Sequence, residues 1–346
     1  MSRIDFSKWP AQAEDTQPGA SQGGLIVPYL DDSDEIEEIP FLFTLNGSHG
    51  LIAAANLHTL QGEKKAGKSA LGLALIVAAL KGEFIGITPS RPDLSLLWID
   101  TEQDTTTLKL KRRAVLAMAG LDKRPDRLRI VTLRGFGSTA DVLRAVLQAI
   151  AENAPDLVFL DGVVDLCEAF NDEEKSRAVI RQLEAAVERY GCAILGLIHT
   201  NKTSKSEARG HLGAVLQQKS AEIYQVAKDG ERTAKVSQPS SRFAPVPDFY
   251  FNFADGFRLE PATSPVDKML AAMRARFAPL FQGGARATRG RLIELYTEAQ
   301  GCGESKAEKD IKAATDAGIL FVEHEGRCAF YSYLFPPLDN EEEEAL

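Results

Sequence analysis

Short apolar segments of β-strand type alternate with helical patterns from about residue 39 to residue 260. The strand-like segments read NLHTLQG, LSLLWID, RLRIVTL, DLVFLDG and CAILGLIHT, and helical ones such as KSALGLALIVAALKG and SRAVIRQLEAAVERYG lie between them. Strands joined through helices form right-handed βαβ units, whose sheet is covered on both faces. The alternation therefore predicts an α/β domain over residues 39–260 with a mostly parallel sheet. Three later segments, SAEIYQVAKDG, RTAKVSQ and DFYFNFADGFRLE, are expected as antiparallel strands added to this sheet.

Both ends of the chain differ from this pattern. Residues 1–38 contain two basic and nine acidic residues and few large apolar ones, so we expect a disordered segment there. Residues 339–346 form an acidic tail with five acids. The net charge of −9 comes from these ends, and the residues between them are slightly basic, so the charge does not exclude a nucleic-acid partner.

The sequence carries no sign of a membrane or secreted protein. No stretch of eighteen uncharged apolar residues occurs, and the N-terminus lacks the charged and apolar regions of a signal peptide. The four cysteines have no C-x-x-C spacing, which favours reduced thiols over a metal site or disulfides. We therefore expect a cytoplasmic protein with no membrane partner.

Residues 266–338 form a second predicted module, which the linker PATSP at 261–265 divides from the first. Its segments read as a helix, two helices around the turn GCG, and a hairpin made of LFVEHEG and RCAFYSYLF. This order resembles a winged helix-turn-helix domain, which implies a small α+β fold that binds duplex DNA through Arg289, Lys306 and Lys309. The module has ten basic and nine acidic residues, so its electric field is weak, and a packing or oligomerisation module remains the alternative.

The segment GEKKAGKS, from Gly62 to Ser69, matches the pattern G-x-x-x-x-G-K-[ST] at every fixed position. It follows a predicted strand and precedes a predicted helix, as a phosphate-binding loop does. Small residues let the backbone wrap around phosphates, where successive N–H groups and the helix N-terminus bind the anion. We therefore expect ATP and Mg²⁺, with Lys68 on the β- and γ-phosphates, Ser69 on the metal, and the rest of the loop around the phosphates: Gly62, Glu63, Lys64, Lys65, Ala66 and Gly67.

An acid suited to the same Mg²⁺ ends another predicted strand. In DLVFLDG, four apolar residues precede Asp161, which we expect at the carboxyl end of its strand, where α/β sheets bind their ligands. Asp156 begins that strand and would lie at the opposite edge of the sheet. Asp161 is thus the predicted Walker B acid, with a turn-capping role as the alternative.

A third acid follows the strand in LSLLWIDTEQD. This segment resembles the RecA-like ATPases, in which a glutamate just after this strand activates the attacking water. The resemblance implies that Glu102 is the catalytic base, while Asp100 has the weaker claim because it belongs to the strand end. The alternative is that both acids only solvate a loop.

The segment from Asp156 to Lys202, which includes DLVFLDGVVDLCEAF and CAILGLIHTNK, resembles the core of plasmid RepA-type hexameric helicases, a branch close to DnaB, RadA and KaiC proteins. The resemblance implies a RecA-like fold over most of residues 40–260, ATP hydrolysis, and a homo-oligomeric ring, with a hexamer expected. His199 and Thr200 match the family's His-Thr pair, and His199 is implied to sense the γ-phosphate. A satisfied loop histidine is the alternative.

Two later segments carry the cations that this family places outside the P-loop. The segment NKTSKSEARGHLG resembles a loop that faces the central channel, which implies single-stranded DNA contacts through Lys202, Lys205 and Arg209, although no aromatic stacking residue accompanies them. The family's Lys-x-Arg finger keeps Arg242 here but has Ser240 in place of the lysine. Arg242 is implied to act on a neighbouring subunit's γ-phosphate, with Arg232 or Lys235 as compensating cations.

Together these features predict a DNA-associated RecA-fold ATPase, a helicase or replication protein of the RepA type from a plasmid or other mobile element. Two other functions stay open. One is a non-motor ATP-dependent regulator that binds duplex DNA. The other is a recombination or repair ATPase of the RadA type, which is disfavoured because no zinc-ribbon cysteines precede the core.

Overall fold

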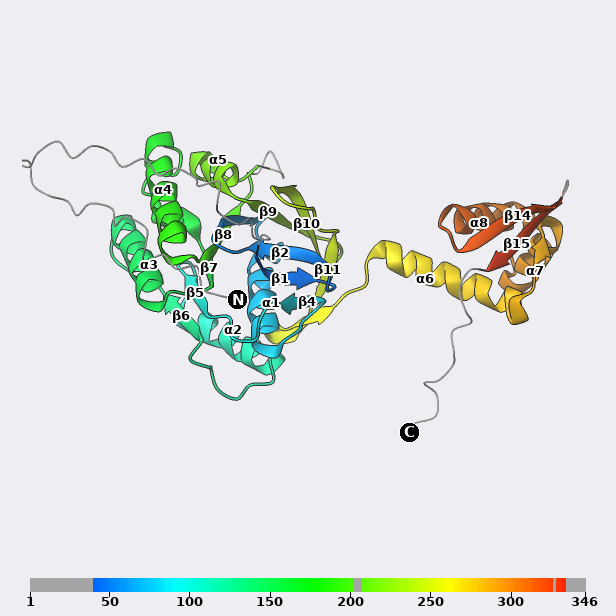
Figure 1. The fold of residues 1–346 in the computed structure, drawn as a ribbon, viewed down its shortest axis with the longest axis horizontal. Helices are drawn as coiled ribbons and strands as arrows, with labels where there is room; N and C mark the ends of the chain where they lie inside the picture. Colours follow the sequence, from blue (N-terminus) through cyan, green and yellow to red (C-terminus); the bar gives the residue numbers. More distant parts are fainter. Residues whose placement is uncertain (1–39, 202–206, 326–327, 334–346) are drawn as a thin grey trace, which may run out of the picture. The chain divides into compact units, whose positions relative to one another are not determined.

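The chain folds into two units, Met1–Ala262 and Thr263–Leu346 (Figure 1). The computed structural model describes residues 40–201, 207–325 and 328–333. The end segments 1–38 and 339–346, as well as Lys202 and Lys205, lie outside the described residues.

The first unit is built on a nine-stranded sheet whose central strands are parallel. In spatial order its strands are β12 (Leu259–Pro261), β11 (Phe249–Phe253), β10 (Thr233–Ser241), β9 (Glu222–Lys228), β3 (Leu57–Gly62), β8 (Ala193–His199), β7 (Leu157–Asp161), β5 (Leu96–Asp100) and β6 (Leu128–Thr132). The three late strands β10, β11 and β12 are antiparallel, as the sequence predicted. For β9 the prediction holds on one side only: β9 pairs antiparallel with β10 but parallel with β3, with His58 opposite Glu222 and Gln61 opposite Gln225.

Helices cover both faces of this sheet, which confirms the predicted α/β class with a mostly parallel sheet (Figure 1). One face packs on α1 (Lys68–Lys81) and α2 (Thr105–Met118), and the other on α3 (Thr139–Asn153), α4 (Glu173–Tyr190) and α5 (Gly210–Lys219). β5 and β7 are buried at every position, which explains their continuous apolar runs. Polar N-caps begin three of the helices: Asp104 before α2, Ser138 before α3 and Asp172 before α4. Short 3₁₀ turns follow β7 (Val163–Leu166) and β11 (Asp255–Phe257).

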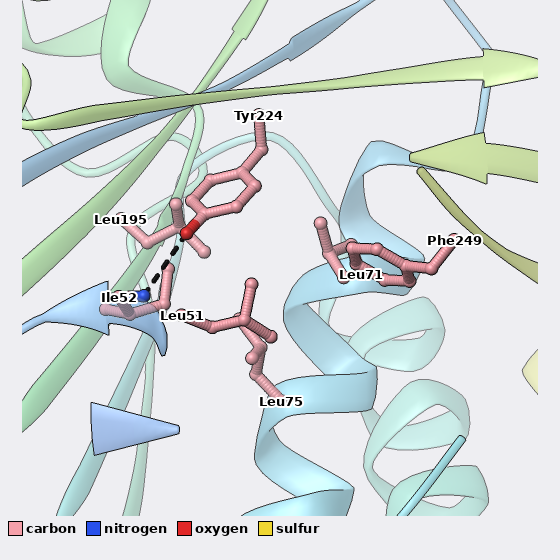
Figure 2. A pocket seen from close by; sticks show the side chains of 7 residues that line it. All are labelled: Leu51, Ile52, Leu71, Leu75, Leu195, Tyr224 and Phe249. Carbon is pink, nitrogen blue, oxygen red and sulfur yellow. Dashed lines mark hydrogen bonds between the residues drawn. The ribbon is translucent and has the colours of Figure 1, made fainter. Parts of the chain in front are cut away.

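A small second sheet, which the sequence did not predict, covers the α1 side of the first unit. It consists of β2 (His49–Ala53), β1 (Phe41–Leu45) and β4 (Ile87–Pro89), all antiparallel. Figure 2 shows how Leu51 and Ile52 of β2 pack toward α1 around a small apolar cavity, which Leu71, Leu75, Leu195, Tyr224 and Phe249 also line. The Ile52 N–H donates to the Tyr224 hydroxyl at 3.2 Å, and Tyr224 donates to Glu222 Oε1 at 2.8 Å, so β2 is tied to β9.

The described residues of the second unit form three α-helices and a three-stranded antiparallel sheet. In chain order it has α6 (Pro265–Phe277), a 3₁₀ segment (Ala278–Gly284), β13 (Ala287–Thr288), α7 (Arg289–Gln300), α8 (Glu304–Asp316), β14 (Leu320–Glu325) and β15 (Cys328–Tyr333). The strands lie in the order β13, β15, β14. Its core includes Phe277, Leu292, Tyr296, Ile311 and Leu320. The sequence predicted the helices and the hairpin but not β13, because two residues carry no pattern. No helix among the described residues of either unit is long and apolar enough to cross a membrane.

Candidate functional site

Four neighbouring parallel strands end at one edge of the main sheet. β3 ends at Gly62, β8 at His199, β7 at Asp161 and β5 at Asp100. Because these strands are parallel and adjacent, their carboxyl ends meet, and ligands of α/β sheets bind at this edge. The structure therefore brings together the segments that the sequence singled out for phosphate, metal and catalysis.

The loop between β3 and α1 needs small residues at two positions. A Cβ on Gly62 would lie 2.2 Å from Val226 O, and a Cβ on Gly67 would lie 2.3 Å from Phe253 Cζ. Gly67 also has a φ of 99°, a left-handed conformation that glycine adopts readily. Within the loop Glu63, Lys64 and Lys65 are exposed, whereas Ala66 is buried. The loop can therefore close around a ligand while its charged side chains point to solvent.

Lys68 is a buried cation of the site. Its Nζ donates to the carbonyls of Gly62 at 2.9 Å and Glu63 at 2.7 Å, and it lies 2.8 Å from His199 Nδ1. Burial lowers the pKa of Lys68 to about 8, and burial together with Lys68 lowers the pKa of His199 to about 4. His199 is thus neutral near pH 7, and since an ammonium group only donates, Nδ1 accepts and Nε2 carries the proton. That Nε2–H faces Glu102, whose Oε1 lies 4.0 Å away.

Ser69 and Asp161 provide the oxygen atoms for a divalent cation. Ser69 Oγ donates to Asp161 Oδ2 at 2.7 Å, and Asp161 is 3% exposed. Burial raises the pKa of Asp161, so a bound cation would stabilise its carboxylate. A hydroxyl and one carboxylate are hard oxygen ligands of the kind that Mg²⁺ accepts when phosphates and water complete its shell. These two residues fit the predicted Mg²⁺ role.

Asp100 and Glu102 have different environments, although they lie two residues apart. Asp100 is fully buried, and its Oδ1 accepts from the backbone N–H groups of Glu102 at 3.1 Å and Gln103 at 2.7 Å. Asp100 therefore shapes the turn that carries Glu102. The Glu102 side chain is 37% exposed, and burial followed by the nearby Asp161 and Asp165 raises its pKa. Glu102 is the acid that a ligand in the site can reach.

Lys111 also belongs to the site, although the sequence reasoning missed it. It lies on α2, is 6% exposed, and places Nζ 3.7 Å from both Asp100 Oδ2 and Asp161 Oδ2. Its cation therefore bridges the two buried carboxylates. The available signal was its spacing: Leu108, Lys111 and Val115 form the buried stripe of α2, and a lysine in such a stripe needs a buried partner.

Thr101 and Asp165 support the turn that holds Glu102, and the sequence reasoning named neither. Thr101 Oγ1 donates to Asp165 Oδ2 at 2.7 Å and approaches the carbonyls of Asp161 and Gly162 at 3.2 and 3.1 Å. A Cβ on Gly162 would lie 2.0 Å from Thr101 Oγ1 and 3.1 Å from Glu102 Cγ. Only a glycine after Asp161 therefore lets the two strand ends approach this closely.

Arg209 lies beside the end of β8. Its N–H donates to His199 O at 2.9 Å, and its guanidinium lies over the Phe170 ring at 5.0 Å. Thr200, the partner of His199 in the predicted pair, donates its N–H to Gly62 O at 3.2 Å, and its buried Oγ1 has no partner among the described residues. Arg209 is the one predicted channel residue that the described part of the chain includes.

Arg242 lies at the other edge of the main sheet. Its N–H donates to Ala221 O, and the Ala221 N–H donates to Leu57 O at the start of β3. Gly62 is five residues farther along β3, about 16 Å away. Arg242 is exposed, donates to Lys219 O at 3.3 Å, and cannot reach the P-loop of its own chain. Of the compensating cations, Lys235 pairs with Asp248 at 2.5 Å and Arg232 with Asp255 at 3.7 Å.

In the second unit, one of the three predicted DNA-contacting cations has an acidic partner. Arg289 pairs with Glu308 at 2.9 Å. Lys306 and Lys309 are exposed on α8, and no ion pair to either occurs among the described residues. These two lysines are therefore the cations of α8 most available to a phosphate backbone.

Comparison with known proteins agrees with a P-loop site. Residues 46–205 match the family model of an AAA domain, which includes the Gly62–Ser69 loop and the strand ends at Asp100 and Asp161. A solved structure, the crystal structure of the RadB recombinase, is similar at a TM-score of 0.45 and 14% identity over 62% of this chain and 94% of that chain. Among curated proteins, no sequence matches the chain. The family match supports a nucleotide-binding ATPase.

Proposed function

We propose that the protein is an ATP-hydrolysing, DNA-associated ATPase of the RepA helicase type that acts as a homo-oligomeric ring. One observation carries the proposal: Lys68, Ser69, Asp161, Glu102 and His199 converge at the carboxyl edge of adjacent parallel strands. This set contains a phosphate-binding cation, two metal ligands, a base and a polar sensor, which are the groups that phosphoryl transfer requires.

In the proposed mechanism the loop from Gly62 to Gly67 binds the phosphates through its N–H groups, and Lys68 turns from its carbonyl partners to the β- and γ-phosphates. Mg²⁺ held by Ser69 and Asp161 would offset the phosphate charge. Glu102 accepts a proton from the water that attacks the γ-phosphorus while the bond to the bridging oxygen breaks. Its raised pKa makes it a stronger base than an ordinary glutamate.

The proposal assigns His199 the role of detecting the γ-phosphate. Its Nε2–H faces Glu102, and its carbonyl accepts from Arg209, so a movement of the imidazole reaches the segment that is proposed to contact single-stranded DNA. Lys202 and Lys205 belong to the same proposed surface. Arg242 is proposed to act on the next subunit, because it lies too far from its own P-loop.

The second unit is proposed to grip duplex DNA. Its order of helices, with β13 pairing to β15 ahead of the β14–β15 hairpin, agrees with a winged helix, and Lys306 and Lys309 supply exposed positive charge on α8. The near balance of acids and bases argues that the binding is weak and depends on few counterions.

The test is steady-state ATPase activity with and without single-stranded DNA, together with the mass of the assembly in Mg²⁺ and a non-hydrolysable ATP analogue. We expect several-fold stimulation by single-stranded DNA and a multi-subunit ring. Lys68→Ala serves as the inactive control. An ATPase rate that single-stranded DNA does not change, together with binding to duplex DNA, would favour the non-motor regulator. Absence of turnover in the folded wild-type protein would refute the ATPase itself.

A further inference from the structure

Three glutamine side chains form a hydrogen-bonded row next to the P-loop. Gln61 of β3 donates from Nε2 to Gln225 Oε1 of β9 at 3.2 Å, and Gln217 of α5 donates from Nε2 to Gln61 Oε1 at 2.6 Å. Gln217 Oε1 then accepts from the Ala208 N–H at 3.4 Å. The middle residue, Gln61, is 0% exposed and immediately precedes Gly62. The row therefore leads from β9 across β3 to α5, and ends at Ala208, just before the start of α5.

The direction of these hydrogen bonds follows from one fixed donor. A backbone N–H can only donate, so Ala208 requires an oxygen from Gln217, and this choice leaves Gln217 Nε2 as the donor to Gln61. The same reasoning makes Gln61 Nε2 the donor to Gln225 Oε1. Gln225 takes part in the row through Oε1 only. Its Nε2 amide group is therefore the end of the row, and this group is a hydrogen-bond donor.

The two ends of the row lie in places with different roles. Gln225 lines a groove together with the loop residues Gly62, Glu63, Lys64 and Ala66. At the other end, Ala208 belongs to a segment that is also tied to β8, since the Arg209 N–H donates to His199 O at 2.9 Å. Phosphate and ribose oxygens are acceptors, so a nucleotide in the groove matches the donor that the row presents.

We propose that this glutamine row is a second connection, separate from His199, through which a nucleotide in the groove fixes the segment 207–213 at the start of α5. The inference rests on the proposed nucleotide binding. A nucleotide oxygen that accepts from Gln225 Nε2 keeps the Gln225 Oε1 atom directed toward Gln61. Hydrogen bonds in a chain also strengthen one another. Gln61 is 0% exposed, so bulk water does not reach its amide, and a change at Gln225 is felt at Ala208.

A neighbouring pair of side chains provides a matched control. Thr59 lies two residues before Gln61 on the same face of β3, is equally buried, and bonds through Oγ1 to Ser220 Oγ at 2.7 Å just after α5. Thr59→Val thus removes a buried hydrogen bond between β3 and the residue after α5, and this bond is not part of the row. Gln61→Leu removes the middle of the row, and Gln217→Leu removes its link to Ala208.

The experiment is hydrogen exchange of the full chain with and without Mg²⁺ and AMP-PNP, with the affinity for this analogue measured by calorimetry. In the wild type and Thr59→Val we expect the analogue to slow exchange of the 207–213 amides about fivefold, the equivalent of one hydrogen bond of about 1 kcal/mol. In Gln61→Leu and Gln217→Leu that slowing is lost, while the affinity for AMP-PNP changes less than about threefold. Gln217→Leu keeps the test decisive if Gln61→Leu does not fold.

The failures of the two proposals are distinguishable. A folded wild type that does not bind AMP-PNP refutes the proposed function and this inference with it. Binding without any slowing in segment 207–213 refutes the inference alone. Slowing that persists in both glutamine variants, or that is lost equally in Thr59→Val, also overturns it.

Discussion

Replacing Lys111 by methionine tests how much this buried cation stabilises the two buried acids beside it, Asp100 and Asp161. The Lys111 Nζ lies 3.7 Å from Asp100 Oδ2 and 3.7 Å from Asp161 Oδ2, and the three side chains are 8%, 0% and 4% exposed. Methionine keeps the length of the side chain and removes its charge. The variant therefore leaves two neighbouring carboxylates without their shared cation.

We expect Lys111→Met to lower the free energy of unfolding by about 3 kcal/mol near pH 7, the low end of the range for removing one partner of a buried ion pair. The low end applies because both carboxylates keep hydrogen bonds, Asp161 from Ser69 and Asp100 from two backbone amides. Burial already raises the pKa of Asp161, and losing Lys111 raises it further. A carboxyl whose pKa is higher in the folded than in the unfolded chain favours folding below the unfolded pKa and loses this contribution as the pH rises. The deficit should therefore shrink toward pH 4.

The measurement is urea unfolding of the wild type and variant at about pH 7 and about pH 4.5, followed by tryptophan fluorescence. Trp98 is fully buried in the first unit, and residues 263–346 contain no tryptophan, so the Trp98 signal reports on that unit. Lys109→Met, an exposed change on the same helix, is the control, and Lys111→Met combined with Asp100→Asn should recover much of the lost stability. A deficit equal to that of Lys109→Met, or one that grows toward acid pH, would refute the reasoning.

Four further changes test the proposed roles of site residues. Lys68→Ala should abolish ATP hydrolysis and weaken nucleotide binding, and retained turnover would exclude the P-loop assignment. Glu102→Gln should keep ATP binding but slow hydrolysis about a hundredfold, and a larger loss in a folded Asp100→Asn protein would show that the wrong acid was chosen. Arg242→Ala should bind ATP but turn over slowly, and mixing it with Glu102→Gln protein should restore some activity; full activity of Arg242→Ala alone would exclude the finger. Lys306→Gln with Lys309→Gln in the full chain should lower duplex affinity and reduce the salt slope by about two, whereas Lys312→Gln, which loses a lysine already paired with Asp316, should change little.

The sequence predicted the parts of the site that depend on position along a strand. Gly62, Asp161 and His199 each end an apolar run, and parallel strands that alternate with helices have their carboxyl ends at one edge. The alternation was therefore enough to predict both the α/β class and the meeting of these residues. The alternation was not enough to predict the direction of β9, which depends on pairing with β3. The preceding helix α5 allows a parallel crossover, and the residue pattern of a strand does not reveal this.

Lys111 and the glutamine row show why the remainder could not be predicted. Both depend on which side chains of α2, α5 and β9 face inward, and that is set by packing between segments distant in the chain. In the sequence, Lys111 belongs to the basic run KLKRR, where its neighbours Lys109 and Arg112 are exposed. A run of basic residues suggests that all of them are solvated. The helical period instead places one lysine on the buried face and its neighbours on the exposed face.

The charges at the site give a physical reason for the proposed contribution of a second subunit. Asp100, Glu102, Asp161 and Asp165 surround the turn after β5, and the buried cations that face them are Lys68 and Lys111. Lys111 is shared between two carboxylates, which leaves Lys68 as the buried lysine of this group that is free to turn to a phosphate. Hydrolysis places further negative charge on the transferring group and therefore needs another cation near the γ-phosphate. Arg209 is stacked on Phe170. Arg242 lies near the start of β3, about 16 Å from the P-loop of its own chain. A ring in which Arg242 of one copy approaches the P-loop of the next would supply this charge, and its arrival would make turnover depend on assembly.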